Sequence, residues 1–482
     1  MALPVERILR IMKPTWIVFL LVNLILSACA PASTPISTPT PNATPLPTAT
    51  PAPTSTSIPT ATPTPIPTIQ VGNVSVPDPR VTNPELFDLT KQEAPIPQFV
   101  NAMQMAGINL TPEQVAQEIS YQTFKDENGN SFVVATYKFN NQLIPLFGAS
   151  NQNGKIKWGD KTSESLGVLG KINNMDMGAM VLVRQIQDPK FLEALKEFNS
   201  ILIDWHFFWE NTEPSQGKYD FSQPNKLIGF ANAKKMNIFG QHLVWGATVP
   251  DWLKNGRYSK DELKEILRNH IINLVKFGDQ KGIKLWTVVN EVGNNDFWLK
   301  NLGEEYVKIA FETFVQSTNA KGLLSDYGND RSGNRYQTNL RLINQLIDEG
   351  IPKDRLGIGL HMRVDAANPP KEEELTELMK SYGIDVYITE LTVDLSNVSG
   401  PPEQRFLKQS EIYETIMRAS LKSGVVKGFF VYGIGDNWSF LETDPDYSKP
   451  NADPSLFFDN YSPKPAVYFL RMALLRSILT RL

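Results

Sequence analysis

Short apolar runs alternate with longer helical patterns from about residue 167 to residue 480, and this alternation restricts the folds open to the chain. Runs of apolar and β-branched residues predict buried strands, whereas apolar residues three or four positions apart predict helices. The predicted strands are Ala179–Val183, Ser200–Asp204, Ile238–Val244, Leu285–Asn290, Gly322–Ser325, Leu356–Leu360, Asp385–Thr389 and Gly428–Tyr432. The predicted helices include Asp188–Phe198, Lys226–Met236, Lys260–Phe277, Glu304–Thr318, Tyr336–Asp348, Glu372–Ser381, Gln404–Lys422 and Ala466–Ile478.

Eight strands, each followed by a helix, predict an α/β fold, the (β/α)8 TIM barrel, over residues 161–480. A doubly wound sheet is the competing fold, but no glycine-rich phosphate-binding loop follows the first strand. Residues 76–160 lack this strand–helix alternation, and their patterns predict a small N-terminal α+β appendage of unknown role. In it, Thr111 with Glu113–Glu118 predicts a capped helix start, and Asn83–Gln104 has helical character. Ser131–Phe139 and Gln142–Phe147 alternate like the two strands of a hairpin.

The first 28 residues have the pattern of a signal peptide, with Arg7, Arg10 and Lys13 before the short apolar core Trp16–Leu26. A core of this length is too short to cross a bilayer as a mature helix. The segment ends in "LSAC", and Cys29 is the single cysteine of the chain, so no intrachain disulfide is possible. This ending resembles a bacterial lipobox, which implies that Cys29 is lipidated and becomes the mature N-terminus. An ordinary secretory signal with an incidental cysteine is the alternative.

Residues 30–75 are predicted to be a Pro/Thr-rich linker, because residues 31–68 hold 12 of the 35 prolines in the chain. Proline lacks an amide donor and Thr-Pro repeats cannot bury a core, so the segment is expected to be an extended tether. A lipid anchor with such a tether predicts a membrane lipoprotein on the extracellular face of the cell, or a secreted protein. The net charge of −4 gives no reason to expect nucleic acid as a partner. We expect a monomer.

Two predicted strands lead into a glutamate. "KLWTVVNEV" leads through the fourth strand to Glu291, and "DVYITEL" through the seventh to Glu390. A buried carboxylate is costly unless it is paired or used, and reactive groups of such barrels lie at the carboxyl ends of the strands. Two facing carboxylates are what glycoside hydrolysis requires. The alternative is that both glutamates are salt-bridged residues of the barrel rim.

Around these residues the chain resembles glycoside hydrolase family 10, the endo-β-1,4-xylanases. The segments that carry the resemblance are "VVNE", "ITEL", "WENTEPSQGKYDF", "GQHLVW…VPDWL", "GLHM" and "VYGIGDNWSF". The resemblance implies a retaining, endo-acting hydrolase of xylan or a related polysaccharide, with no cofactor. Glu291 would be the general acid/base, Glu390 the nucleophile, and Asn290 a donor to the sugar 2-hydroxyl. A retaining pair of carboxyls is expected to lie about 5–5.5 Å apart.

The chain departs from the family at residues that would line the sugar-binding side of the cleft. Asp204, Trp205 and Phe208 stand where the family has Glu, Asn and Lys, and Thr392 replaces an Asp. Trp245 and His361 are kept, and Tyr432 replaces a tryptophan. We predict that substrate contacts Asp204, Trp245, His361 and Tyr432. Because the hydrogen-bonding residues are altered, the polysaccharide is predicted to be either xylan or another β-glycan. A catalytically weak barrel that binds a polysaccharide at the cell surface is the rival hypothesis.

Metal binding is not predicted. The four histidines, His206, His242, His270 and His361, do not have metal-ligand spacing. His270 lies in a helical pattern and is expected to face solvent. Asp444 and Asp446 could suggest a calcium loop, but acidic loops are common and we predict no site there.

Overall fold

The computed structural model describes residues 68–71, 74–77, 100, 111–117, 119–125, 131–139, 142–152, 155–158, 165–293, 297–330, 333–443 and 448–481. Cys29, most of the predicted linker and the pair Asp444 and Asp446 lie outside these ranges. Of the helix predicted over Asn83–Gln104, only Val100 is described.

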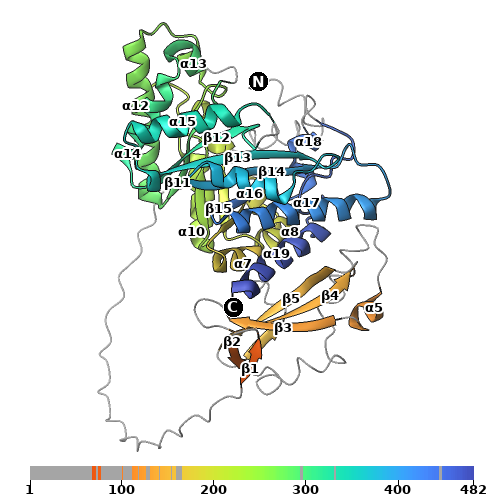
Figure 1. Ribbon diagram of the computed structural model, residues 1–482. Coiled ribbons are helices and arrows are strands. Elements are labelled where there is room, and N and C mark those ends of the chain that lie inside the picture. Colours follow the sequence, from red (N-terminus) through yellow and green to blue (C-terminus); the bar gives the residue numbers. More distant parts are fainter. Residues whose placement is uncertain are drawn as a thin grey trace, which may run out of the picture. The chain divides into compact units, whose positions relative to one another are not determined.

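A closed sheet of parallel strands forms the centre of the larger part of the chain (Figure 1). Its strands are β7 (Asp176–Met180), β8 (Ser200–Ile203), β9 (Asn237–Gly240), β10 (Val244–Trp245), β11 (Leu285–Asn290), β12 (Lys321–Tyr327), β13 (Leu356–Asp365), β14 (Asp385–Asp394) and β15 (Val426–Val431). β15 pairs with β7, and β11 pairs with both β9 and β10, so the sheet closes on itself. The predicted (β/α)8 barrel is confirmed.

The third barrel position differs from its prediction because one predicted strand is broken in two. β9 pairs with the beginning of β11, through Phe239 and Leu285, and β10 pairs with its end, through Val244 and Val289. Gln241, His242 and Leu243 lie between β9 and β10, where the backbone amides of Gln241 and Leu243 still donate to the Ile203 and Thr287 carbonyls at 2.9 Å. The strand predicted over Ile238–Val244 contains Gly240, Gln241 and His242, and the break falls at these residues.

Helices follow the strands, and α12 has capping signals at both ends. The helices of the barrel are α7 (Leu166–Ile172), α8 (Pro189–Leu195), α9 (Trp209–Thr212), α10 (Ser222–Lys234), α11 (Asp251–Lys254), α12 (Lys260–Lys281), α13 (Phe297–Leu302), α14 (Glu305–Ser317), α15 (Tyr336–Asp348), α16 (Glu372–Ser381), α17 (Pro402–Ser423), α18 (Phe440–Thr443) and α19 (Pro465–Arg481). On α12, Ser259 and Glu262 form a reciprocal capping box, and Gly282 ends the helix in a left-handed conformation.

Two apolar clusters hold the barrel together. The smaller one joins strand residues inside the barrel, including Leu202, Phe239, Leu323 and Phe430. The larger one packs the outer faces of the strands against the helices. The interior is therefore a filled core, as in other barrels of this type, and polar chemistry is left to the strand ends.

The described part of residues 76–160 is a small antiparallel sheet. It contains β3 (Ile119–Lys125), β4 (Ser131–Phe139), β5 (Gln142–Gln152) and β6 (Lys155–Trp158), paired in that order. The predicted hairpin is confirmed by the pairing of β4 with β5. Helix α5 (Pro112–Gln117) follows Thr111, whose backbone amide and hydroxyl form reciprocal hydrogen bonds with Gln114. A further hairpin, β1 (Thr68–Val71) with β2 (Val74–Pro77), overlaps the end of the predicted linker.

Within the described ranges, no helix has both the length and the apolar character needed to cross a membrane.

Candidate active site

Glu291 is the first residue beyond the carboxyl end of β11. Its side chain is 16% exposed, and its backbone amide donates to the Ser325 carbonyl of β12 at 2.8 Å. Its φ of 51° lies in the left-handed region, which costs a non-glycine residue about 1–3 kcal/mol. Such a conformation persists only where the surroundings hold it, and it turns the chain sharply at the barrel mouth.

Glu390 lies within β14, not at its end. The prediction that the seventh strand ends here is wrong, because β14 continues to Asp394 beside the long strand β13. The pairing shifts register at this point with both neighbouring strands, between Leu360 and His361 of β13 and between Ile388 and Leu391 of β14. Such bulges re-aim side chains. The Glu390 side chain is 19% exposed, and apart from Asp385 the other residues of β14 are buried.

His361 lies between the two glutamates. Its Nδ1 is 3.8 Å from Glu291 Oε1, and its Nε2 is 3.3 Å from Glu390 Oε1. Burial alone would lower the pKa of His361, but Glu390, then Glu291 and Asp326, outweigh it and raise this pKa to about 9. At neutral pH the ring is therefore a cation that lies between the two carboxyl groups. The structure brings Glu291, Glu390 and His361 together.

Glu390 has a second partner that the sequence did not single out. The Gln241 side-chain amide, just after β9, donates to Glu390 Oε1. Gln241 is fully buried, and its own oxygen accepts from the Thr287 hydroxyl of β11 at 3.2 Å. Burial and then the charge of Glu291 raise the pKa of Glu390, whereas His361 and the Gln241 amide favour its charged form. The break between β9 and β10 is what places Gln241 here.

Asp204 and Tyr432, both predicted to contact substrate, contact each other. The Tyr432 hydroxyl donates to Asp204 Oδ2 at 2.5 Å, and Asp204 Oδ1 lies 3.2 Å from His242 Nε2. Burial, reinforced by Glu390, raises the pKa of Asp204 well above its usual range, and burial lowers the pKa of His242. These three side chains form a buried polar group beside the two glutamates. A sugar hydroxyl would have to join or displace this group.

Aromatic rings form a wall next to Asp204. Phe208 stacks on His242 at 5.2 Å between centroids, and Trp205, 41% exposed, lies parallel to Phe208 at 6.5 Å. Trp245 meets this wall edge-on, 5.6 Å from Phe208, and the buried Nε1 of Trp245 has no hydrogen-bond partner in the structure. Trp205 and Phe208 thus add apolar surface at positions where the family that the sequence resembles has hydrogen-bonding residues.

Asn290, the last residue of β11, is almost fully buried, and its side-chain oxygen has no hydrogen-bond partner in the structure. An unpaired buried amide oxygen is costly, so a partner from outside the chain would stabilise it. The predicted contact is a donation by the Asn290 amide, whereas the unpaired oxygen would accept a hydrogen bond from a substrate hydroxyl.

His270 does not face solvent, and that prediction is wrong. Its ring is fully buried on the inner side of α12, stacks on Trp209 at 3.6 Å, and places Nδ1 2.8 Å from Glu213 Oε2. The carboxylate and the indole compensate for burying a polar ring, which a helical pattern alone does not reveal. Among the described residues, no group of three or more His, Cys, Asp or Glu side chains is arranged to hold a metal ion.

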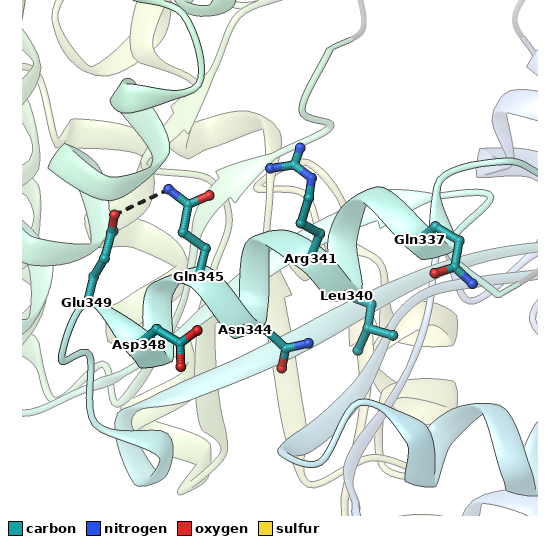
Figure 2. A pocket seen from close by; sticks show the side chains of 7 residues that line it. All are labelled: Gln337, Leu340, Arg341, Asn344, Gln345, Asp348 and Glu349. Carbon is teal, nitrogen blue, oxygen red and sulfur yellow. Dashed lines mark hydrogen bonds between the residues drawn. The ribbon is translucent and has the colours of Figure 1, made fainter.

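A surface hollow lies on α15, and Figure 2 shows the side chains that line it. They are Gln337, Leu340, Arg341, Asn344, Gln345, Asp348 and Glu349, and Gln345 donates to Glu349 at 3.2 Å. All of them come from one helix and the residue that follows it. None is a residue of the carboxylate site.

Comparison with known proteins agrees with this geometry. The family described as Glycosyl hydrolase family 10 matches residues 168–473. Endo-1,4-beta-xylanase B of Thermotoga neapolitana is 26% identical over 291 residues, which are 58% of this chain and 82% of that protein. Exoglucanase XynX of Acetivibrio thermocellus is 28% identical over 301 residues, which are 58% of this chain but 27% of that protein. Xylanase 10B from Thermotoga petrophila RKU-1, solved with xylobiose, superposes with a TM-score of 0.60 at 26% identity, over 65% of this chain and 98% of that one.

Proposed function

Because the chain belongs to glycosyl hydrolase family 10, we propose that it cleaves internal β-1,4 bonds of xylan or a related plant polysaccharide, with retention of configuration. One observation carries the proposal. Glu291 and Glu390 come from different strands of the barrel and approach opposite nitrogens of one imidazole. A rim of ordinary salt bridges would pair each carboxylate with its own cation.

The chemistry would proceed in two steps. Glu390 attacks the anomeric carbon while Glu291 gives its proton to the glycosidic oxygen, so the C–O bond breaks and a glycosyl ester of Glu390 forms. Glu291 then removes a proton from water, which attacks the same carbon and frees Glu390. Gln241 and the His361 cation hold the Glu390 oxygen in place through both steps.

The proposed substrate class rests on the names of similar proteins and on the aromatic residues beside Asp204. Two similar proteins are named xylanases and one an exoglucanase, so both xylan and glucan belong in the test. The Phe208 ring cannot hydrogen-bond to sugar hydroxyls, and the Tyr432 hydroxyl already donates to Asp204. Sites with fewer such partners discriminate less between sugars.

The test uses protein starting near Val76, incubated with xylan, mixed-linkage glucan and mannan, with reducing ends measured over time. Wild type is expected to release sugar from xylan. Glu390→Gln should lose nearly all turnover but still bind the polysaccharide, because its shape is unchanged. Glu374→Gln, at an exposed position on α16, is the matched control and should keep full activity.

If reducing ends are released from glucan or mannan alone, the proposed mechanism stands and the proposed substrate changes. If no polysaccharide is cut but one is retained in a pull-down, the tethered binding barrel is the better hypothesis. Retention is tested separately by proton NMR of the first product formed. An α-anomer appearing first would show inversion and remove Glu390 as the nucleophile.

We also propose that the enzyme is a monomer anchored on the outer face of the cell by a lipid on Cys29. The basic start, the short apolar core and the "LSAC" ending support the lipid anchor, as does the proline-rich segment after it. Incorporation of labelled palmitate into the full chain, lost in Cys29→Ala, tests the anchor. Labelling that persists in Cys29→Ala, or is absent from both proteins, contradicts it, and light scattering of the released protein tests the monomer.

A further inference from the structure

We propose that Arg335 is a positioning residue, which fixes the backbone turn that carries Glu291 and so aims the acid/base at the glycosidic oxygen. This inference rests on the proposed function. Arg335 stands at the start of α15, 44 residues after Glu291 in the chain. Its Nη1 donates to the carbonyl oxygen of Val292, the residue that follows Glu291.

The turn at Glu291 needs a restraint from outside itself. Glu291 has a φ of 51° and Gly293 a φ of 90°, so two of three consecutive residues are left-handed. The Glu291 amide is bound to Ser325 of β12, which fixes one end of the turn. The Val292 carbonyl, bound by Arg335, fixes the other. A strained turn with both ends held keeps one conformation, and the Glu291 side chain inherits that direction.

Arg335 is itself held from several sides. Its Nη1 lies 3.2 Å from Asp326 Oδ2, and its Nη2 donates to the Tyr327 hydroxyl at 2.9 Å. The guanidinium also lies over the Tyr327 ring, 4.4 Å from the centroid. Asp326 is buried and accepts a second hydrogen bond from Asn339, at 3.1 Å. The planar fork of an arginine thus joins β12, the start of α15 and the turn after β11.

Asp326 completes the restraint electrostatically. Burial raises its pKa to about 6, although Arg335 and Asn339 oppose the rise. Above that pH the carboxylate is charged and the ion pair with Arg335 is intact. A lysine at position 335 could keep the charge, but one ammonium cannot contact the Val292 carbonyl, Asp326 and the Tyr327 hydroxyl with the same fixed geometry.

The experiment compares substrates that differ only in their need for the acid. Dinitrophenyl β-xylobioside has a leaving group that departs without a proton, whereas phenyl β-xylobioside needs one. Values of kcat/KM are measured for wild type, Arg335→Lys and Arg335→Met with Asp326→Asn. The double variant avoids leaving Asp326 as an unpaired buried charge, which alone could prevent folding. Arg341→Ala removes an exposed arginine of the same helix that pairs with Glu304, and is the matched control.

A misaimed acid should lower kcat/KM on the phenyl substrate by about 100-fold and change it little on the dinitrophenyl substrate. The lysine variant should fall between wild type and the double variant, and Arg341→Ala should match wild type on both substrates. Equal losses on both substrates would mean a general structural role and would overturn the proposal, as would no loss on either.

The test separates this inference from the function on which it rests. If wild type cleaves neither xyloside, the same pair of aryl cellobiosides is used, which changes the specificity and keeps the comparison. A wild type that cleaves no aryl glycoside overturns both proposals. Normal cleavage by wild type, with equal losses in the Arg335 variants, overturns the role of Arg335 alone.

Discussion

His361 is the residue through which the two candidate catalytic carboxylates are coupled. Each nitrogen of the ring faces one of them, so a change in the protonation of His361 alters the field at both glutamates. A positive charge between two negative ones lowers their mutual repulsion. This arrangement lets the barrel hold two carboxyl groups close together.

We predict that His361 makes stability fall as the pH rises. Its folded-state pKa of about 9 exceeds the usual 6.5, so its stabilising contribution is complete below pH 6.5 and is lost between 6.5 and 9. The shift corresponds to about 3 kcal/mol. The difference in free energy of unfolding between wild type and His361→Asn should therefore shrink as the pH rises through this window.

Urea denaturation of both proteins across this pH range measures that difference. The same comparison between wild type and His270→Asn is the control. Burial lowers the pKa of His270, so the difference in free energy of unfolding should not decline across the same window. If the difference between wild type and His361→Asn is constant from below pH 6.5 to above pH 9, the ring is not a shared cation in the folded protein.

Among the secondary-structure elements, β9 is the one whose packing most directly supports the site. Gly240 ends β9 and precedes Gln241, and a Cβ on Gly240 would lie 2.4 Å from ring atoms of Trp286 on β11. The Trp286 ring is fully buried, and a Cβ on Gly278 of α12 would also lie 2.4 Å from it, so the ring is held between the two glycines. Glycine at position 240 lets the two strands approach closely enough for Gln241 to reach Glu390.

We predict that Gly240→Ala destabilises the protein by about 1–3 kcal/mol, as other overpacked cores do, and lowers turnover by displacing Gln241. Gly229 provides the matched control, because it lies exposed within α10 and a Cβ there meets no atom within 4 Å. Gly229→Ala should stabilise the helix by roughly 0.5–1 kcal/mol and leave activity unchanged. Thermal unfolding and xylan hydrolysis measure both effects, and equal behaviour of the two variants would contradict the packing argument.

For the whole molecule, the closed barrel explains how distant segments make one site. β15 pairs with β7, so the last strand completes the ring begun by the first. The site residues lie between Asp204 and Tyr432, all within the range that the family matches. A domain of this kind has its own core and closes without help from outside the ring.

We therefore predict that a chain beginning at residue 161 folds and cleaves an aryl xyloside with the same kcat/KM as one beginning at Val76. A small soluble substrate is needed, because a polymer could be bound by the residues removed. Circular dichroism and kinetics of the two proteins test this. A shorter chain that is folded but inactive would show that residues 76–160 contribute to the site.

The sequence by itself determined the fold class and was enough to identify Glu291 and Glu390 as candidate catalytic residues. Each rests on local information: apolar runs of strand length, helical spacing between them, and a carboxylate directly after or within a buried strand. β11, α15 and α16 were predicted with the bounds they have. The motif resemblance depends on the same short segments, which explains why it also pointed to the right family.

Only the tertiary structure decided which side chains of the site contact one another. The contact of Gln241 with Glu390 spans 149 residues, and that of Tyr432 with Asp204 spans 228. Such contacts depend on barrel closure, on the break between β9 and β10 and on the bulge at Glu390, none of which is local. His270 shows the same limit, because a helical pattern does not tell that Trp209 and Glu213 will cover that face. Periodicity reports which face is buried on average, whereas partners far apart in the chain decide what each polar side chain does.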